Sequence, residues 1–204
     1  MGDRFSNNQI FGATPLDRDE AQGLIPSYIA TQAALNAAEQ ENILAGRIWA
    51  LNGRREWEAI VDESFVRRLH LRMFGEVWRW AGTYRLSQKT IGMDWPMIGS
   101  QVRELCLNTR YWIENKTYQG LELAARVHHR LVYIHPFPNG NGRHARLFTD
   151  CLLAALQQRS LSWGEGSRSS ERILRVGPAR AEYISALQAA DRRDFDPLVA
   201  FISK

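Results

Sequence analysis

Apolar residues recur at helical spacing along most of the chain. The clearest case is ESFVRRLHLRMFGEVWRWAG, residues 63–82, which Gly82 is expected to end. Its apolar side chains would share one helical face: Phe65, Leu69, Met73, Val77 and Trp80. Half-buried strands need strict alternation instead. The chain is therefore predicted to be an all-α, single-domain helical bundle.

Residues 1–30 contain Asn, Asp, Gly and Pro at short intervals and predict an irregular N-terminal arm. The helical domain is then expected over residues 31–204. Thr31 would cap a helix over 31–53, and Gly53 would end it. Further helices are predicted at 97–115, 120–134, 143–159 and 178–190, with one or two more turns after residue 190.

One stretch breaks the helical pattern. TYRLSQKTIGMDWP, residues 83–96, is rich in β-branched and aromatic residues, and Gly92 and Pro96 lie near its end. This composition favours a short β-hairpin or an extended flap over a helix.

Charge and hydropathy exclude several functions. The net charge of +4 comes without a clustered basic stripe, so an anionic ligand fits and a nucleic-acid partner does not. Neither an apolar run of about 18 residues nor a leader-like start is present, so we expect no membrane partner and a cytoplasmic location.

The junction IHPFPNGNGRHARL, residues 134–147, combines several ligand-binding features. The residue before Pro136 is pushed out of helical conformation, so one helix should end at His135 and the next should begin after NGNG. A helix N-terminus presents free backbone N–H groups to an anion, and glycines allow close approach. Arg143 and Arg146, three residues apart, could bind the same anion, most naturally a polyphosphate.

His135 lies at the other end of this loop. Its ordinary pKa near 6.5 suits a general base that takes a proton from a hydroxyl group. Phe137, between two prolines, is interpreted as a buried structural anchor of the loop. Taken singly, such residues are usually structural, but their combination within twelve positions favours function.

HPFPNGNGRHAR, residues 135–146, resembles the signature of the Fic/Doc family, His-x-Phe-x-Asp/Glu-Gly-Asn-Gly-Arg-x-x-Arg. MFGEVWRWAGTYR, residues 73–85, is similar to a second recurrent block, and the likeness extends over residues 60–203. The length and the N-terminal arm also resemble the subgroup called mobile mystery protein B, which is associated with mobile elements.

The resemblance implies AMP transfer from ATP to a Ser, Thr or Tyr hydroxyl of a protein target. It assigns the base to His135, phosphate binding to Gly140, Asn141, Gly142, Arg143 and Arg146, and target docking to the flap, around Lys89, Thr90, Ile91 and Gly92.

One position departs from the signature. Asn139 stands where the family usually has Asp or Glu to hold Mg²⁺. An amide carbonyl is a weak ligand for a hard cation that prefers carboxylates. The resemblance therefore implies ATP as substrate with Mg²⁺, and Asn139 as a weak metal ligand.

Many family members carry an inhibitory helix, Ser/Thr-x-x-x-Glu-Gly/Asn, whose glutamate pairs with the second signature arginine, here Arg146. Within residues 31–53, Glu41 followed by Asn42 fits the end of that motif, although Ala37 replaces Ser/Thr. Glu39 is the rival, because it lies on the face expected to be buried. Either glutamate is a candidate inhibitory residue.

Two alternatives to AMP transfer stay open. A Doc-like phosphotransferase would bind ATP in the reversed sense, which the two glycines of GNG disfavour. A non-catalytic nucleotide- or partner-binding module, as half of a toxin-antitoxin-like pair with an antitoxin-like partner, is supported by Asn139.

Overall fold

The computed structural model describes residues 17–163 and 177–204, and over these residues it confirms the all-α prediction. The helices are α1 (Arg18–Ala21), α2 (Gln32–Asn52), α3 (Trp57–Ile60), α4 (Glu63–Phe74), the 3₁₀ helix η1 (Trp95–Met97), α5 (Ile98–Glu114), α6 (Gly120–Ile134), α7 (Asn141–Ala155), α8 (Pro178–Asp191) and α9 (Asp196–Ser203).

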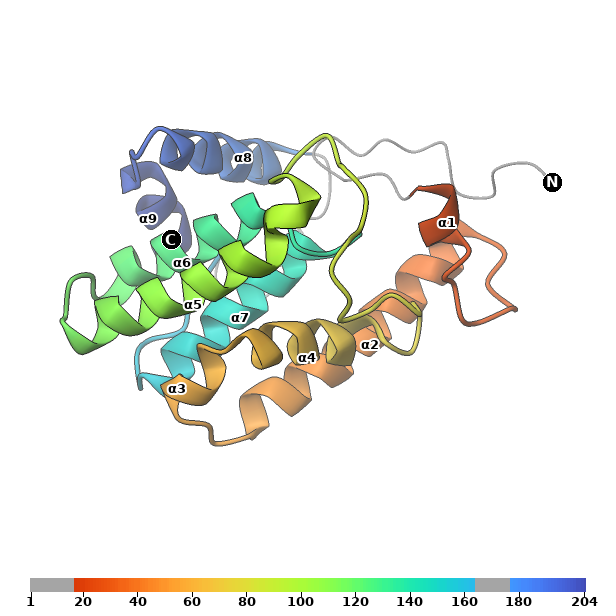
Figure 1. Cartoon of the computed structure of the whole chain (residues 1–204), viewed down its shortest axis with the longest axis horizontal. Helices are drawn as coiled ribbons and strands as arrows, with labels where there is room; N and C mark the ends of the chain where they lie inside the picture. Colours follow the sequence, from red (N-terminus) through yellow and green to blue (C-terminus); the bar gives the residue numbers. More distant parts are fainter. Residues whose placement is uncertain (1–16, 164–176) are drawn as a thin grey trace.

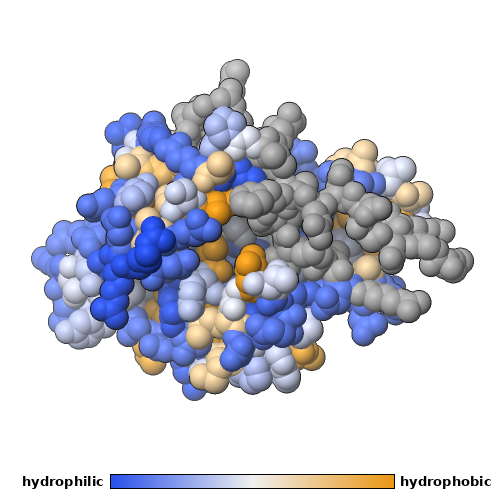
Figure 2. All heavy atoms as spheres, turned by 90° about the horizontal axis from the view of Figure 1, so that it is seen from above, coloured by the Kyte–Doolittle hydropathy of each residue, from blue (hydrophilic) through white to orange (hydrophobic). Residues whose placement is uncertain are grey.

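The α6–α7 pair forms the centre of the bundle. In Figure 1, α2 and α4 lie on one side of this pair and α8 and α9 on the other, while α5 runs beside α6. Two buried apolar clusters result, one shared by α2, α4, α5, α6 and α7 and one that joins α8 and α9 to α6 and α7. Seen from the α8 side, the described surface is mostly hydrophilic, with scattered hydrophobic residues (Figure 2). The loop between α6 and α7 is thus held by packed helices.

Helix α2 begins and ends as predicted. The Thr31 side chain accepts a hydrogen bond from the Ala34 N–H at 3.2 Å, and Gly53 follows the last turn. The helix crosses α4 closely at Gly46, where a Cβ atom would lie 2.8 Å from the Arg72 carbonyl oxygen. Asn42 donates to that same oxygen at 3.1 Å. Asn42 therefore joins α2 to the end of α4.

The helix predicted over residues 63–82 is shorter than expected, because α4 ends at Phe74 and Gly75 follows as its C-cap. Beyond it the chain turns, and Trp78 forms an isolated antiparallel bridge with Leu24. The backbone thus exchanges helical hydrogen bonds for bonds to the N-terminal segment, which periodicity cannot reveal.

The predicted irregular arm is only partly described. Residues 17–30 contain the single turn of α1 followed by turns, and residues 1–16 lie outside the described residues. At the other end, α8 and α9 correspond to the last predicted helix and the extra turns. Among the described helices, none has the length and apolar content needed to cross a membrane.

The flap, residues 86–95, has no β-hairpin and takes the extended form, which was the other form predicted for this stretch. Its backbone and that of Arg85, just before it, bond to the α6–α7 loop: the Arg85 N–H donates to the Pro136 carbonyl at 2.9 Å, and the Met93 N–H to the Ile134 carbonyl at 3.5 Å. In a hairpin, the backbone N–H groups would instead donate to carbonyls of the opposite strand.

Candidate active site

His135 ends α6 in the left-handed conformation, with φ 53° and ψ 58°. The following proline disfavours helical geometry at this position. Arg85, just before the flap, holds the turned backbone, because its Nε donates to the His135 carbonyl oxygen at 2.8 Å. His135 is 6% exposed, and its burial, followed by the charge on Arg85, lowers its pKa to about 4. It is therefore neutral near pH 7 and able to accept a proton.

Asn141 closes the α6–α7 loop on itself. Its side-chain oxygen accepts the Phe137 N–H at 2.9 Å, and its side-chain nitrogen donates to the Phe137 carbonyl at 2.8 Å. Phe137 is fully buried. The Asn141 side chain is thus occupied within the loop, which leaves only its backbone N–H for a ligand.

His70, which the motif analysis missed, braces the same loop from α4. Its ring stacks on Phe137 with centroids 3.7 Å apart. Its Nδ1 accepts the Gly82 N–H at 3.0 Å, so its Nε2 carries the proton and donates to the Asn139 carbonyl at 3.1 Å. The signal in the sequence is weak: a histidine within the apolar face of a helix.

The N-terminus of α7 forms the anion-binding part of the loop. Gly140 precedes the helix with φ 78°, and a Cβ atom there would lie 2.5 Å from the Phe74 ring. Only glycine fits both the backbone angle and the space. The backbone N–H groups of Asn141, Gly142 and Arg143 lie in the first turn, where helical carbonyls cannot reach them. They suit phosphate oxygens.

The two signature arginines lie at this end of α7. Arg143 Nη2 is 3.4 Å from Asn139 Oδ1. Arg146 is 6% exposed, and its Nη1 lies 3.7 Å from the position of a Cβ atom on Gly142. Both guanidinium groups therefore flank the first turn, where their charge would act on a bound polyphosphate.

Glu39 of α2 binds Arg143. Its Oε2 lies 2.7 Å from Arg143 Nη1, and its Oε1 accepts a hydrogen bond from Trp78 Nε1 at 2.7 Å. The side chains of Glu39 and Arg143 are 12% and 20% exposed. Glu41 is exposed. The structure therefore brings Glu39 rather than Glu41 to the loop, and to Arg143 rather than to the expected Arg146.

Arg146 instead faces α8. Its guanidinium carbon lies 5.8 Å from the centre of the Tyr183 ring, and the Tyr183 hydroxyl oxygen is 2.8 Å from His128 Nε2. Burial lowers the pKa of His128 to about 3, so its ring is neutral and hydrogen-bonds to that hydroxyl. Tyr183 therefore lies between His128 and Arg146. This contact, from a helix far along the chain, was not predicted.

Asn139 is a poor metal ligand in this geometry. Its side-chain oxygen accepts the Gly140 N–H at 2.6 Å and lies near Arg143. Across residues 17–163 and 177–204, no group of three His, Cys, Asp or Glu side chains could hold a metal ion. The donor set thus does not fit a resident Mg²⁺, because hard cations need several oxygen ligands.

The predicted docking residues of the flap differ in exposure. Thr90 and Ile91 are exposed, whereas Lys89 is buried. Gly92 packs directly against His135, since a Cβ atom at Gly92 would be 2.5 Å from His135 Cβ. The flap therefore covers His135.

Acid should weaken the fold through its buried histidines. The pKa values of His128, His135 and His144 are lowered from 6.5 to about 3, 4 and 4, mainly by burial. Between pH 6.5 and 4 the unfolded chain binds protons that the folded chain does not, so stability is full above pH 6.5 and is lost as pH falls. We expect the unfolding free energy to drop by about 1.4 kcal/mol per pH unit for each histidine in this window.

Urea unfolding at pH 7 and pH 5 measures this loss, and histidine NMR titration assigns it. Equal stability at both pH values would contradict the prediction.

Residues 60–153 match the family model described as Fic/DOC family. The matched residues include the α6–α7 loop. Fic-1 of Caenorhabditis elegans, named a protein adenylyltransferase, is 32% identical over 127 residues, or 61% of this chain and 23% of Fic-1. Protein adenylyltransferase Fic of Aedes aegypti is 28% identical over 142 residues, or 68% of this chain and 26% of that protein. The chain thus spans about a quarter of the length of these relatives.

Solved Fic structures share the fold. BepC of Bartonella tribocorum, solved with bound AMPPNP, superposes with a TM-score of 0.66 at 17% identity and covers 92% of this chain and 97% of that one. A fragment of C. elegans Fic-1 gives a TM-score of 0.60 at 22% identity, over 90% of this chain and 51% of that one. The predicted Fic-like helical bundle is confirmed.

Proposed function

We propose that this chain transfers AMP from ATP to a hydroxyl group of a protein target. The observation that carries the proposal is the position of neutral His135 and of Arg143 and Arg146 around the N-terminus of α7. The adenylyltransferase names of the relatives and the AMPPNP bound by BepC support it.

Each part of the loop has a role in this reaction. The first-turn N–H groups of α7 and the two arginines bind the phosphates and stabilise the negative charge that develops on the leaving pyrophosphate. His135 accepts the proton of the target hydroxyl as its oxygen attacks the α-phosphorus. The bond between the α-phosphorus and the bridging oxygen breaks, AMP stays on the target, and pyrophosphate leaves.

Incubation of the purified chain with α-labelled and, separately, γ-labelled ATP in a cell lysate tests the proposal. We expect the α-label on protein and none from the γ-label. Transfer of the γ-label alone would replace the proposal with a phosphotransferase. Nucleotide binding without transfer, also after Glu39 is replaced, would leave a binding module.

Regulation of the site belongs to the same proposal. The carboxylate of Glu39 holds Arg143, which a nucleotide phosphate would otherwise bind. We infer that α2 inhibits the site and that Glu39 is the inhibitory residue. Because the pair lies within one chain, inhibition does not require a separate antitoxin-like partner.

Asn139→Asp is expected to strengthen Mg²⁺ binding, so that transfer needs less Mg²⁺. A carboxylate would add one charged oxygen ligand for a cation that otherwise depends on the ATP phosphates. We expect half-maximal activity at a Mg²⁺ concentration about tenfold lower. A titration of Mg²⁺ at fixed ATP measures the shift, with Asn139→Gln as the neutral control. An unchanged titration midpoint for both variants would show that residue 139 does not contact the metal.

Tyr183→Phe is expected to weaken ATP binding by about three- to tenfold, because the polar hydroxyl next to the Arg146 guanidinium helps to fix its position. The ring and its packing stay, but the buried His128 ring loses its hydroxyl partner, so the melting temperature should also fall. Calorimetric titration with ATP and with adenosine separates the two effects, since adenosine has no phosphate. Equal losses for both ligands would contradict a positioning role.

A further inference from the structure

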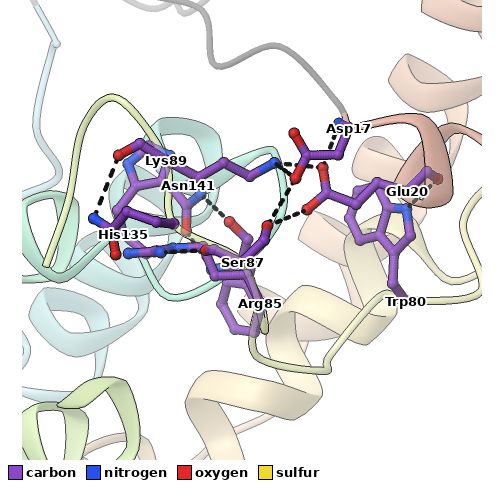
Figure 3. Close-up of polar contacts among 10 residues, drawn as sticks. Asp17, Glu20, Trp80, Arg85, Ser87, Lys89, His135 and Asn141 are labelled. Atoms are coloured by element: carbon purple, nitrogen blue, oxygen red, sulfur yellow. Dashed lines mark hydrogen bonds and ion pairs between the residues drawn. The ribbon is translucent and has the colours of Figure 1, made fainter. Parts of the chain in front are cut away.

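A buried lysine connects the flap to the N-terminal segment. The Lys89 side chain is 4% exposed, and its ammonium lies 2.9 Å from Asp17 Oδ2 and 2.5 Å from Glu20 Oε2. Figure 3 shows this side chain extending from the flap, beside His135, toward the two carboxylates of the α1 region. A buried ammonium is stable only with counter-charges, because it has lost its hydration.

The carboxylates are held by the body of the protein rather than by the flap alone. Trp80 Nε1 donates to the Glu20 backbone carbonyl at 3.0 Å. The Asp17 N–H donates to Glu20 Oε2 at 2.8 Å, and the side chains of both residues accept from Ser87 Oγ, at 2.8 and 3.5 Å. The segment with α1 is therefore a fixed support, and Lys89 and Ser87 attach the flap to it.

The attached flap blocks His135. Gly92 has φ 97° and lies directly against the His135 side chain. Arg85 also binds the carbonyl oxygens of His135 and Ser87, at 2.8 and 2.7 Å. A target hydroxyl can reach His135 only if residues 86–93 move away. That movement takes Lys89 from its two carboxylates.

We propose that Lys89 recognises a carboxylate of the target protein, and that Asp17 and Glu20 occupy this position as an intramolecular substitute that keeps the flap closed. The identity of the reaction in this inference rests on the proposed function. The closure of the flap over His135 does not depend on it. The partner is an acidic segment that also carries the acceptor hydroxyl. Its carboxylate replaces the counter-charge that Lys89 loses on opening.

The alternative is an ordinary stabilising ion pair with no role in access. Neutralising the two acids distinguishes these possibilities. A stabilising pair would lower the stability of the whole chain, whereas a latch formed by Asp17, Glu20 and Lys89 would release only the flap. Asp19 offers a matched control, because it lies on α1, is exposed, and loses the same charge in Asp19→Asn.

The first experiment is hydrogen–deuterium exchange of the full chain without nucleotide. In the double variant Asp17→Asn, Glu20→Gln we expect residues 86–93 to exchange about tenfold faster, with α4, α6 and α7 unchanged. Asp19→Asn should match the wild type. Unchanged flap exchange, or faster exchange throughout the chain, would overturn the latch.

The second experiment is fluorescence anisotropy with two labelled peptides, one with Glu around a central Ser and one with Gln at the same positions. We expect the double variant to bind the acidic peptide about tenfold more tightly than the wild type does, and more tightly than the Gln peptide. Lys89→Gln in that background should abolish the preference. Equal affinity for both peptides would overturn recognition by Lys89.

Both measurements are independent of catalysis. If the chain transfers no label from ATP but the flap opens and binds the acidic peptide, the proposed function fails and the latch stands. If transfer occurs while flap exchange and peptide preference stay unchanged, the latch fails and the proposed function stands.

Discussion

His135→Ala is expected to lower the rate of AMP transfer by about 10²- to 10⁴-fold, the usual contribution of a general base. Burial keeps the imidazole neutral, with its pKa lowered to about 4, so its proton-accepting form predominates at pH 7. Alanine removes the acceptor but keeps the backbone carbonyl that Arg85 binds. The rate at which the α-label is transferred from ATP to protein, measured at saturating ATP, gives the size of this loss.

His144→Gln is the matched control for this substitution. His144 is also buried, with its pKa lowered to about 4, but its ring bonds to the Val66 carbonyl at 2.8 Å and packs against Phe137, with ring centroids 5.0 Å apart. It should affect stability more than the rate per folded molecule. If both variants transferred AMP as the wild type does, His135 would not be the base. ATP binding by His135→Ala, checked by calorimetry, shows that the site is otherwise formed.

Glu39→Gly is expected to raise AMP transfer by about 10- to 100-fold. The charged hydrogen bond to Arg143 that it removes contributes about 1.5–3 kcal/mol, and this amount no longer opposes phosphate binding. Glu39→Gln removes the charge and keeps the side-chain length, so it separates the ion pair from helix effects of glycine. Initial rates with α-labelled ATP, over a range of ATP concentrations, measure the gain.

Glu41→Gln is the control for Glu39. It carries the same charge change on the same helix, but the side chain is exposed. The structure predicts no gain in transfer for this variant. A gain with Glu41→Gln and none with Glu39→Gln would contradict the assignment and favour the motif-based alternative. A loss with Glu39→Gln would instead make the Glu39–Arg143 pair part of the active conformation.

The N-terminal latch and the α2 glutamate would act on different parts of the site. Asp17 and Glu20 restrain the flap, through which the target must pass, whereas Glu39 holds an arginine of the nucleotide site. Release of one does not break a contact of the other. Combining the two sets of substitutions should therefore give nearly multiplicative gains in transfer, as expected for independent sites.

Local features of the sequence predicted where α6 ends, and they predicted the start of α7 only approximately, because α7 begins at Asn141, inside NGNG, rather than after it. The end of α6 at His135 depends on the proline that comes after it, and the start of α7 depends on glycine at 140. These are short-range steric effects within a few residues. The same holds for the Thr31 cap of α2. The helical periodicity likewise predicted the fold class, because the pattern depends only on which face of each helix is buried.

Sequence patterns gave wrong secondary structure, or left two forms open, where a local preference competes with bonds to residues far away in the chain. The pattern over residues 63–82 favoured one long helix, but residues near Trp78 pair with the segment around Leu24 instead. The composition of the flap left a hairpin or an extended form open, and its backbone groups bond to the α6–α7 loop. In both cases the tertiary bonds satisfy polar groups that periodicity assigns to local structure.

Sequence patterns alone were enough to predict the helical class, the loop with its histidine and arginines, and two equivalent glutamates in α2. Helix packing was needed to choose between Glu39 and Glu41, to bring His70 under the loop, and to place Lys89 against the carboxylates of the α1 region. Glu39 and Arg143 are 104 positions apart, and His70 and Asn139 are 69 apart. Such contacts depend on how the helices pack against one another, and no local pattern of side chains encodes that packing.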